Sequence, residues 1–426
     1  MNRFSVLKRG LLAAAGLTLL TMPGFAGEQE RAVLVHYADL ARAVYGDSLS
    51  AARDLQAAVD RLIAKPTEDN LDAARMAWRA SRVPYQQSEV YRFGNAIVDD
   101  WEGKVNAWPL DEGLIDYVAA SYGAESEENP GYRANVIASA SFEFGGQTID
   151  AGQITKALLS DTLHQIGGVE ANVATGYHAI EFLLWGQDLN GTGPGAGARP
   201  ATDFDPDNCS WGSCERRAAY LKAATDLLID DLAWMHAQWG VDGEARKGLL
   251  GGAVEQGLAT IVTGMGSLSY GELAGERMQL GLLLHDPEEE HDCFSDNTHY
   301  SHYYDALGIR NIYLGEYRRV DGSMLKGPGI SSLVAAVSPD ADATLRSQLD
   351  ATMAAMEKLV ASAKGGEAYD QMIGPDNHPG HARVQAAIDA LRVQTGGIER
   401  AASALKLGLI EFEGSDSLDN SEAVFQ

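Results

Sequence analysis

His178 and Glu181 stand three residues apart in the segment Gly-Tyr-His-Ala-Ile-Glu-Phe-Leu-Leu-Trp-Gly, which covers residues 176–186. On a helix this spacing places an imidazole and a carboxylate on one face, so that both can point at one atom. The pair suits a divalent or ferric metal ion, with iron favoured and zinc possible, because mixed nitrogen and oxygen donors suit transition metals better than calcium. A hydrogen-bonded structural pair is the alternative. The apolar run after Glu181 indicates a buried helix, where a carboxylate needs a partner or an ion, and this favours the metal site.

The motif pair does not complete a zinc-protease signature. No histidine in the chain is followed by glutamate, which excludes His-Glu-x-x-His, and Phe182 occupies the place where His-x-x-Glu-His needs its second histidine. A catalytic zinc site needs three protein ligands and an open position. We therefore expect further ligands from elsewhere in the fold, with Glu89 and Asp111 as candidates and Glu112 beside Asp111. Each of these carboxylates is otherwise expected at the surface or next to an arginine.

A second concentration of ligand-type side chains lies at residues 288–299, in the run Glu-Glu-Glu-His-Asp-Cys-Phe-Ser-Asp-Asn-Thr-His, followed by His302 and Asp305. Its carboxylates and imidazoles are compatible with a metal site. Acidic runs of this kind are more often solvated, and we expect a solvated loop here, within an irregular stretch at residues 286–329.

The N-terminus has the organisation of a secretory signal. Basic residues precede an apolar run at residues 10–20, and small residues follow around Ala26. We therefore predict a signal peptide at residues 1–26 and an exported protein, either periplasmic or associated with the outer membrane. The apolar run is too short to span a bilayer and no comparable run follows it, so we expect no transmembrane segment in the mature chain.

Export also bears on the three cysteines. Cys209 and Cys214 flank four residues of a Gly-, Pro- and Asp-rich stretch. An oxidising compartment favours a loop-closing disulfide between them. Cys293 is left over and is expected as a buried free thiol.

The net charge of the chain indicates which kinds of molecule it can bind. The chain carries 60 acidic and 33 basic residues, which gives a formal net charge of −27 at pH 7. Such a surface repels phosphate backbones and anionic lipids, and this argues against nucleic-acid binding. The same charge is compatible with the attraction of cations.

The elements that must position these side chains are helices. Ala, Leu, Glu and Gln recur at helical spacing while alternating Val, Ile and Thr runs are scarce, so the predicted fold class is all-α. Residues 31–64 form one predicted amphipathic helix that ends before Pro66, and Thr67 is the predicted N-cap of a second helix that continues toward Phe93. Residues 94–145 form a long irregular excursion. Further helices are expected at residues 153–165, 169–185, 215–239, 244–262, 265–284, 340–363 and 380–412.

The length of the chain suggests two or three domains, at about 150 residues per domain. The clearest linker composition is the Gly- and Pro-rich run at residues 191–214. We therefore divide the mature chain into a first helical domain at residues 27–190, which carries the motif, and a second helical domain at residues 215–412. A polar tail at residues 413–426 is expected to remain without packed structure.

Several separate runs together resemble the imelysin family, also called peptidase family M75. Residues 176–181 resemble its Gly-x-His-x-x-Glu motif. The resemblance extends to residues 91–94, 106–112, 293–299 and 308–315, and the last groups are most similar to the iron-regulated protein A branch. Because these runs are spread over nearly all of the mature chain, their combination is more specific than the first motif alone.

The resemblance implies two helical-bundle domains related by duplication, with the motif near their interface, in proteins exported to the periplasm or outer envelope. It carries the motif roles onto His178 and Glu181. It carries a ligand role onto Glu89 by its place in the helix before residues 91–94. It also implies an association with iron uptake or iron limitation, and a metallopeptidase label.

Three functions follow from the residues and the resemblance. The first, which we favour, is a metal-binding envelope protein that serves iron uptake or the response to iron limitation, with a metal ion and envelope iron-uptake components as partners. The second is a metallopeptidase of the cell envelope acting on a protein substrate, with Glu181 as ligand or general base, although a third nearby ligand is missing. The third is a non-catalytic envelope interaction module, in which His178 and Glu181 form a structural hydrogen bond.

Overall fold

The structure is a computed structural model that describes residues 23–123, 126 and 129–425. Residues 1–22 of the predicted signal segment lie outside the described residues, so the signal peptide stays a prediction. None of the helices in this described part of the chain has the length and hydropathy that crossing a lipid bilayer requires.

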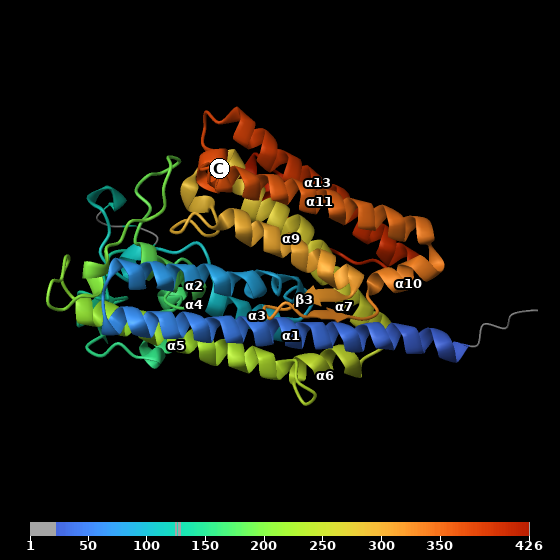
Figure 1. Ribbon diagram of the computed structural model, residues 1–426, viewed down its shortest axis with the longest axis horizontal. Coiled ribbons are helices and arrows are strands. Elements are labelled where there is room, and N and C mark those ends of the chain that lie inside the picture. The colour runs from blue at the N-terminus through green and yellow to red at the C-terminus, as the bar shows by residue number, and fades with distance from the viewer. Residues whose placement is uncertain (1–22, 124–125, 127–128, 426) are drawn as a thin grey trace, which may run out of the picture.

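Helices dominate the molecule, and the predicted all-α class is confirmed (Figure 1). The strands of the described chain form two small antiparallel hairpins, β1 (Ser141–Phe144) with β2 (Gln147–Asp150) and β3 (Glu316–Arg318) with β4 (Met324–Lys326). The helices are α1 (Pro23–Ala64), α2 (Glu68–Gln86), α3 (Ala96–Asn106), α4 (Gly176–Trp185), α5 (Cys214–Gln238), α6 (Glu244–Gly251), α7 (Val254–Ser267), α8 (Leu280–Leu284), α9 (Thr298–Leu314), α10 (Ile330–Val337), α11 (Pro339–Lys364), α12 (Tyr369–Ile373), α13 (His378–Ala404) and α14 (Asp416–Asp419). A π-helical segment, Leu268–Gln279, connects α7 to α8.

The two helices predicted on either side of Pro66 are α1 and α2, and they pack against each other as an N-terminal hairpin. α1 ends before Pro66 because the residue that precedes a proline is biased away from helical geometry. The Thr67 hydroxyl caps α2 by accepting the backbone N–H of Asn70 at 3.3 Å. α2 ends at Gln86, short of the predicted Phe93.

Helix α5 packs against α1 and α4, although it follows the predicted linker at residues 191–214. Figure 1 shows α1, α2, α4 and α5 together in one half of the molecule, and α9, α11 and α13 together in the other half. The chain therefore passes from the first half to the second near α6 and α7. This point lies later in the sequence than the predicted boundary at residues 191–214. One connected hydrophobic core includes residues of both halves. The division into two domains, and their relation by duplication, stay predictions.

Helix α9 lies within the stretch 286–329 that was expected to be irregular, and that prediction is wrong for the residues of α9. The helix buries His302 and Asp305 along with its apolar side chains, so its sequence lacks the apolar stripe by which surface helices are found. It packs against the end of α2, where a Cβ on Gly308 would lie 2.7 Å from the Gln87 carbonyl oxygen. α9 thereby joins the two halves.

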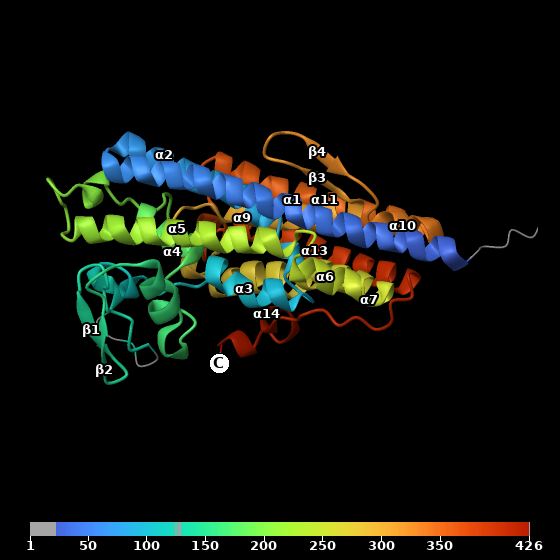
Figure 2. The same cartoon turned by 90° about the horizontal axis from the view of Figure 1, so that it is seen from below.

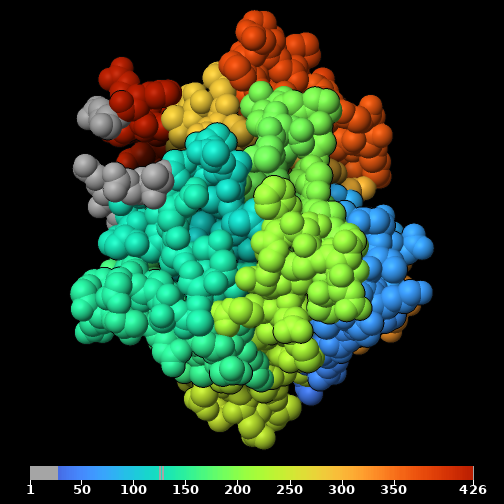
Figure 3. Space-filling model, turned by 90° about the vertical axis from the view of Figure 1, so that its left-hand side faces the viewer, coloured from blue at the N-terminus to red at the C-terminus, as the bar shows by residue number. Residues whose placement is uncertain are grey.

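Irregular segments cover one end of the molecule. Residues 107–175 (teal to green) and 186–213 (light green) form much of that surface in Figure 3, and the β1–β2 hairpin projects from it in Figure 2. The excursion predicted at residues 94–145 contains the regular helix α3 as well as strand β1. Helix α4 begins at Gly176 rather than at the predicted residue 169, and extended backbone precedes it.

The polar tail is packed, contrary to the expectation from its composition. Ser417 is buried, and its hydroxyl donates to the Gly275 carbonyl at 3.0 Å. The hydroxyl of Tyr270 donates to Asp419 at 2.6 Å. The tail is thus held by the π-helical segment, an interaction between residues that are distant in sequence.

Candidate functional site

Helix α4 holds the motif in a buried position. All ten of its residues are buried, in agreement with the apolar run. Its first residue is glycine for a steric reason, since Gly176 has a φ of +79° and a Cβ there would lie 2.4 Å from the Val105 carbonyl oxygen. Trp78 on α2 donates its indole N–H to the Tyr177 carbonyl at 3.0 Å. α4 is therefore fixed against both α2 and α3.

His178 and Glu181 contact each other directly. The Nδ1 atom of His178 lies 3.0 Å from one carboxylate oxygen of Glu181. The other oxygen of Glu181 accepts the backbone N–H of Ser295 at 3.0 Å. Both oxygens are thus engaged, whereas the Nε2 atom of His178 is buried with no hydrogen-bond partner among the described residues. Glu181 orients the ring, and Nε2 is the atom left to bind a ligand.

His291 and Asp292 reach the same place from the loop between α8 and α9. The rings of His178 and His291 lie 4.8 Å apart. One nitrogen of each ring and one carboxylate oxygen of Asp292 all lie within 4.8 Å of one another. Both His291 and Asp292 are 0% exposed, so the expectation of a solvated loop at residues 288–299 is wrong for these two residues. We call His178, His291 and Asp292 the His178 group.

Burial determines the charge of the two imidazoles. It lowers the pKa of His178 to about 3, with the nearby Arg82 guanidinium as the second cause. It lowers the pKa of His291 well below the ordinary range. Both rings are therefore neutral at pH 7. The Nε2 lone pair of His178 has no partner in the described chain, whereas the nitrogens of His291 lie 3.2 Å from the Gln86 amide and 3.5 Å from the Asn106 amide, which a metal ion would displace.

Asp292 is held by donors from three segments. Arg82 on α2 donates to one carboxylate oxygen at 2.8 Å, and Asn297 at 2.8 Å and Ser301 at 2.5 Å donate to the other. Burial opposes the ionisation of Asp292, but the Arg82 charge and the hydrogen bonds from Ser301 and Asn297 act against it, and together the neighbours hold the pKa below its ordinary value. Because a carboxylate oxygen accepts two bonds, these contacts fix Asp292 and leave it able to bind a further ligand.

A partly open cavity of about 340 Å³ reaches His178. The carboxylates on its wall are Asp111, Glu112, Glu288 and Glu289. Asp111 accepts from the Asn129 amide at 2.5 Å, which holds it on the cavity wall and not within the His178 group. Burial, followed by the charge of Glu112, raises the pKa of Glu288 to about 8. Glu288 is therefore mostly protonated at pH 7, and the attraction of cations toward the group at the end of the cavity is left to Asp111, Glu112 and Glu289.

Glu89 belongs to a different cluster. Arg277, in the π-helical segment, donates to Glu89 at 2.7 Å, to Glu272 at 2.9 Å and to Asp305 at 3.1 Å. Glu89, Arg277 and Asp305 are buried. We call these four residues the Arg277 cluster. The ion pair accounts for the burial of Glu89, and its contacts do not favour a ligand role.

A second group of ligand-type atoms lies close by. Glu290, Asp296 and Asp370 each offer one carboxylate oxygen, and these oxygens lie within 4.8 Å of one another. Glu290 and Asp296 come from the ligand-rich run that was noted in the sequence. Asp370 comes from α12 and was not anticipated, because one aspartate in a short helix carries no local signal.

The cysteines lie outside both groups. Cys209 and Cys214 are joined by a disulfide, with their Cα atoms 5.9 Å apart. Cys293 is a free thiol that lines the cavity beside His178 and is only partly buried. Burial raises the pKa of this thiol well above its ordinary value, so it is not a reactive thiolate at neutral pH.

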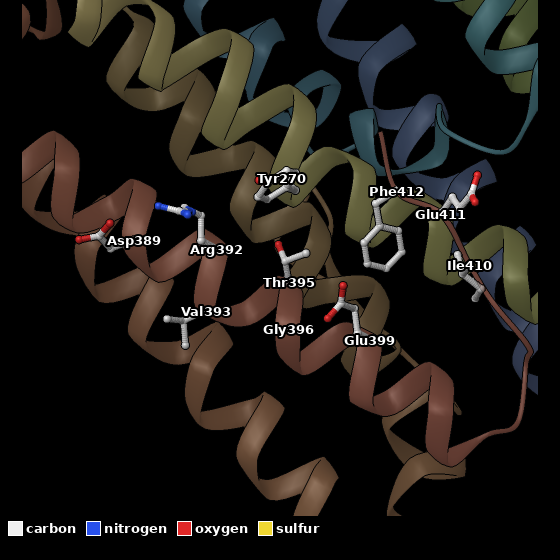
Figure 4. A pocket seen from close by; sticks show the side chains of 10 residues that line it. All are labelled: Tyr270, Asp389, Arg392, Val393, Thr395, Gly396, Glu399, Ile410, Glu411 and Phe412. Atoms are coloured by element: carbon white, nitrogen blue, oxygen red, sulfur yellow. The ribbon is translucent and has the colours of Figure 1, made fainter. Parts of the chain in front are cut away.

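A larger cavity, of about 890 Å³, lies between α13 and the extended segment that precedes the tail (Figure 4). Arg392, Thr395 and Glu399 line it from α13, and Phe412 lies across from them on the extended segment. The described residues that line it include neither histidine nor cysteine. We therefore place the candidate site at the smaller cavity, where buried donor atoms converge.

The chain is similar to known proteins along most of its length. The sequence model of the family described as Imelysin, peptidase M75, matches residues 41–397. A curated relative, the iron-regulated protein A of Synechococcus elongatus, is 30% identical over 127 residues, which make up 29% of this chain and 33% of that protein. The chain thus matches only about a third of the length of this relative.

Two solved structures have the same fold. One is described as an iron-regulated protein A precursor from Parabacteroides distasonis, with a TM-score of 0.65 and 20% identity over 89% of this chain and 95% of that chain. The other is an imelysin-like protein from Psychrobacter arcticum, with a TM-score of 0.59 and 16% identity over 90% of this chain and 98% of that chain. At these identities the likeness concerns the fold alone.

Proposed function

The chain belongs to the imelysin family, and from that premise we propose that it binds a transition metal ion, with iron favoured, at the His178 group. The proposed ligands are His178, His291 and Asp292, and Glu181 orients His178. The observation that carries the proposal is the buried Nε2 atom of His178, which has no hydrogen-bond partner in the described chain and lies beside two further ligand-type side chains.

The donor set supports iron. Two imidazoles and one carboxylate are the ligands by which many proteins hold non-haem Fe(II), and zinc accepts the same donors. A metal-bound histidine ordinarily bonds a carboxylate through its other ring nitrogen. The 3.0 Å contact between His178 and Glu181 is of this kind. The residues present therefore fit a resident transition metal ion.

We further propose that metal binding serves iron uptake or the response to iron limitation in the cell envelope. The curated relative is named iron-regulated protein A. The first 26 residues have the pattern of a secretory signal, and the carboxylates of the cavity wall favour the entry of cations. On this proposal the partners are the metal ion and envelope components of iron uptake.

Metal analysis tests the proposal. The purified chain is incubated anaerobically with Fe(II), desalted and assayed for bound iron, alongside His178→Ala and His291→Ala. We expect both variants to lose the iron that the wild-type chain retains. The control is His378→Ala, at an exposed position on α13, which keeps it. Equal iron in the wild-type chain and in His178→Ala would refute the proposed site.

The two alternatives are separated by the same variants. Glu181 bonds His178 through one oxygen and the Ser295 backbone through the other, which are the contacts of a residue that orients the histidine, and this supports metal binding over the general-base role that the metallopeptidase alternative assigns to Glu181. Chelator-sensitive cleavage of a protein substrate that Glu181→Gln abolishes would favour it. A loss of thermal stability in His178→Ala, with no change in bound metal, would favour the interaction module.

A further inference from the structure

Three carboxylates outside the His178 group converge on a second point. Glu290 and Asp296 come from the loop before α9, and Asp370 comes from α12. One oxygen of each carboxylate lies within 4.8 Å of one oxygen of the other two. Glu290 and Asp370 are both 0% exposed. The group therefore connects the loop that carries His291 to the C-terminal half of the chain.

The oxygens of this group lack the donors that buried carboxylates need. Both oxygens of Glu290, both of Asp370 and one of Asp296 are buried with no hydrogen-bond partner in the part of the chain that the structure describes. Asp292, in the same loop, has Arg82 as its ionic partner at 2.8 Å. A buried carboxylate without such a partner is costly unless a proton or an ion neutralises it.

The pKa values of these carboxyls are raised, as expected where buried carboxylates lack a nearby positive charge. Burial, followed by the charge of Asp296, raises the pKa of Asp370 to about 7. Burial, followed by the charge of Asp188, raises the pKa of Asp296 to about 6, although Arg79 opposes the rise. Near neutral pH the carboxyls of Asp370 and Asp296 can therefore lose their protons to make room for a bound cation, and this loss costs little free energy.

We propose that Glu290, Asp296 and Asp370 form a second cation site, which takes a hard ion of the Ca²⁺ class through oxygen ligands alone. Ca²⁺ binds about six to eight oxygen atoms. The three converging oxygens supply part of that shell. The second oxygens of Glu290 and Asp370, which also lack a partner in the described chain, together with water or backbone carbonyls, can complete it. The absence of nitrogen donors from the group distinguishes it from the His178 group, whose imidazoles suit transition metals.

The second site acts on the loop that it shares with the first. Glu290 directly precedes His291, and Asp296 lies in the same loop as Asp292. A cation held between this loop and α12 fixes the backbone that presents His291 and Asp292 to His178. Occupation of the second site therefore strengthens binding at the His178 group, and the coupling is reciprocal.

Calcium titration of the full chain tests the second site. After treatment with chelator, Ca²⁺ raises the Tm of the wild-type chain, and Asp370→Asn, which removes one ligand charge at constant size, abolishes that rise. Asp376→Asn, at an exposed position just after α12, is the matched control and retains it. His178→Ala also retains the Ca²⁺ response, so failure of the proposed iron site and failure of the calcium site are distinguishable.

Two results would overturn the second site. One is a wild-type chain whose Tm does not respond to Ca²⁺, and the other is an equal response in Asp370→Asn. In either case protons neutralise the three carboxyls. A measurement on the wild-type chain does not depend on whether a variant folds. Tb³⁺ bound at the site gives luminescence that is sensitised by Tyr369, a neighbour of the group whose pKa is raised by burial and by the charge of Glu290. Emission that Ca²⁺ displaces supports the site, and its absence contradicts it.

Discussion

The Arg277 cluster and the His178 group are buried close together, yet their polar atoms are satisfied in different ways. Arg277 lies near enough to the His178 group to help lower the pKa of both His178 and His291. Its guanidinium donates to three carboxylates, and all three of its nitrogens are used. The His178 Nε2 atom, by contrast, has no partner in the described chain. In the Arg277 cluster the guanidinium offsets most of the cost of burial, although one oxygen of Asp305 stays without a partner in the described chain. In the His178 group that cost is left to a ligand.

This contrast shows which property of a buried polar cluster points to binding. Carboxylates are numerous in both places, so their number does not discriminate. Glu89 has the residue type of a metal ligand but already has an arginine at 2.7 Å. His178 has a carboxylate on one nitrogen and an unused atom on the other. An unpartnered donor atom that converges with other ligand-type side chains, and not charge density, marks the binding site.

The largest expected effect comes from removing the arginine. Arg277→Met leaves Glu89, Glu272 and Asp305 without their shared donor. Loss of one partner from a buried ion pair costs about 3–5 kcal/mol of stability. Urea unfolding of the variant and the wild-type chain at pH 7 measures the difference.

A surface pair provides the control for Arg277→Met. Lys247 pairs with Glu244 at 2.9 Å on α6, with the two side chains 53% and 69% exposed. Lys247→Met is expected to cost no more than about 1 kcal/mol, because exposed pairs contribute little. A loss at Arg277 no greater than the loss at Lys247 would remove the structural role that the comparison assigns to the Arg277 cluster.

The next effect concerns the orientation of His178. Glu181→Gln keeps the size of the side chain and replaces the carboxyl group that faces the Nδ1 atom with an amide. Substitution of a residue that hydrogen-bonds a metal ligand weakens metal affinity by about 10–100-fold. Competition with a chelator of known affinity measures the change. Unchanged affinity would mean that Glu181 does not orient the ring, and a loss as complete as that of His178→Ala would identify Glu181 as a direct ligand.

The smallest effect is a pH dependence beside the Arg277 cluster. Burial, followed by the charge of Glu89, raises the pKa of Glu102 from its ordinary 4.5 to about 7. Since the folded form holds the proton more tightly than the unfolded form, the stability that this adds is present below pH 4.5 and is lost as the pH rises through 7.

Glu102→Gln, which imitates the protonated carboxyl, is therefore expected to be more stable than the wild-type chain near pH 8, by an amount on the order of 1 kcal/mol. Near pH 4 the two chains should be almost equally stable. Urea unfolding at both pH values gives the two differences. If the variant shows no gain near pH 8, the pKa of Glu102 in the folded chain is not raised, and its burial beside Glu89 is offset by Arg92 and Arg277.

Local sequence determined the elements whose signals span only a few residues. The end of α1 before Pro66 and the cap at Thr67 are of this kind, because each depends on a proline or a hydroxyl next to the backbone that it affects. The burial of α4 followed from its continuous apolar run. The contact between His178 and Glu181 followed from helical spacing alone. These features are properties of single segments, so neighbouring residues suffice to predict them.

Only the tertiary structure decided which polar side chains meet. Arg82 and Asp292 are 210 positions apart in the sequence, and Glu89 and Arg277 are 188 apart. Their types made them possible ligands or ion-pair partners. The packing of α9 against α2, against the turn that carries Glu89 and against the π-helical segment selected one role for each. Asp370 joined the second group for the same reason. A donor atom is free or engaged according to what the rest of the fold places beside it, and no local pattern contains that information.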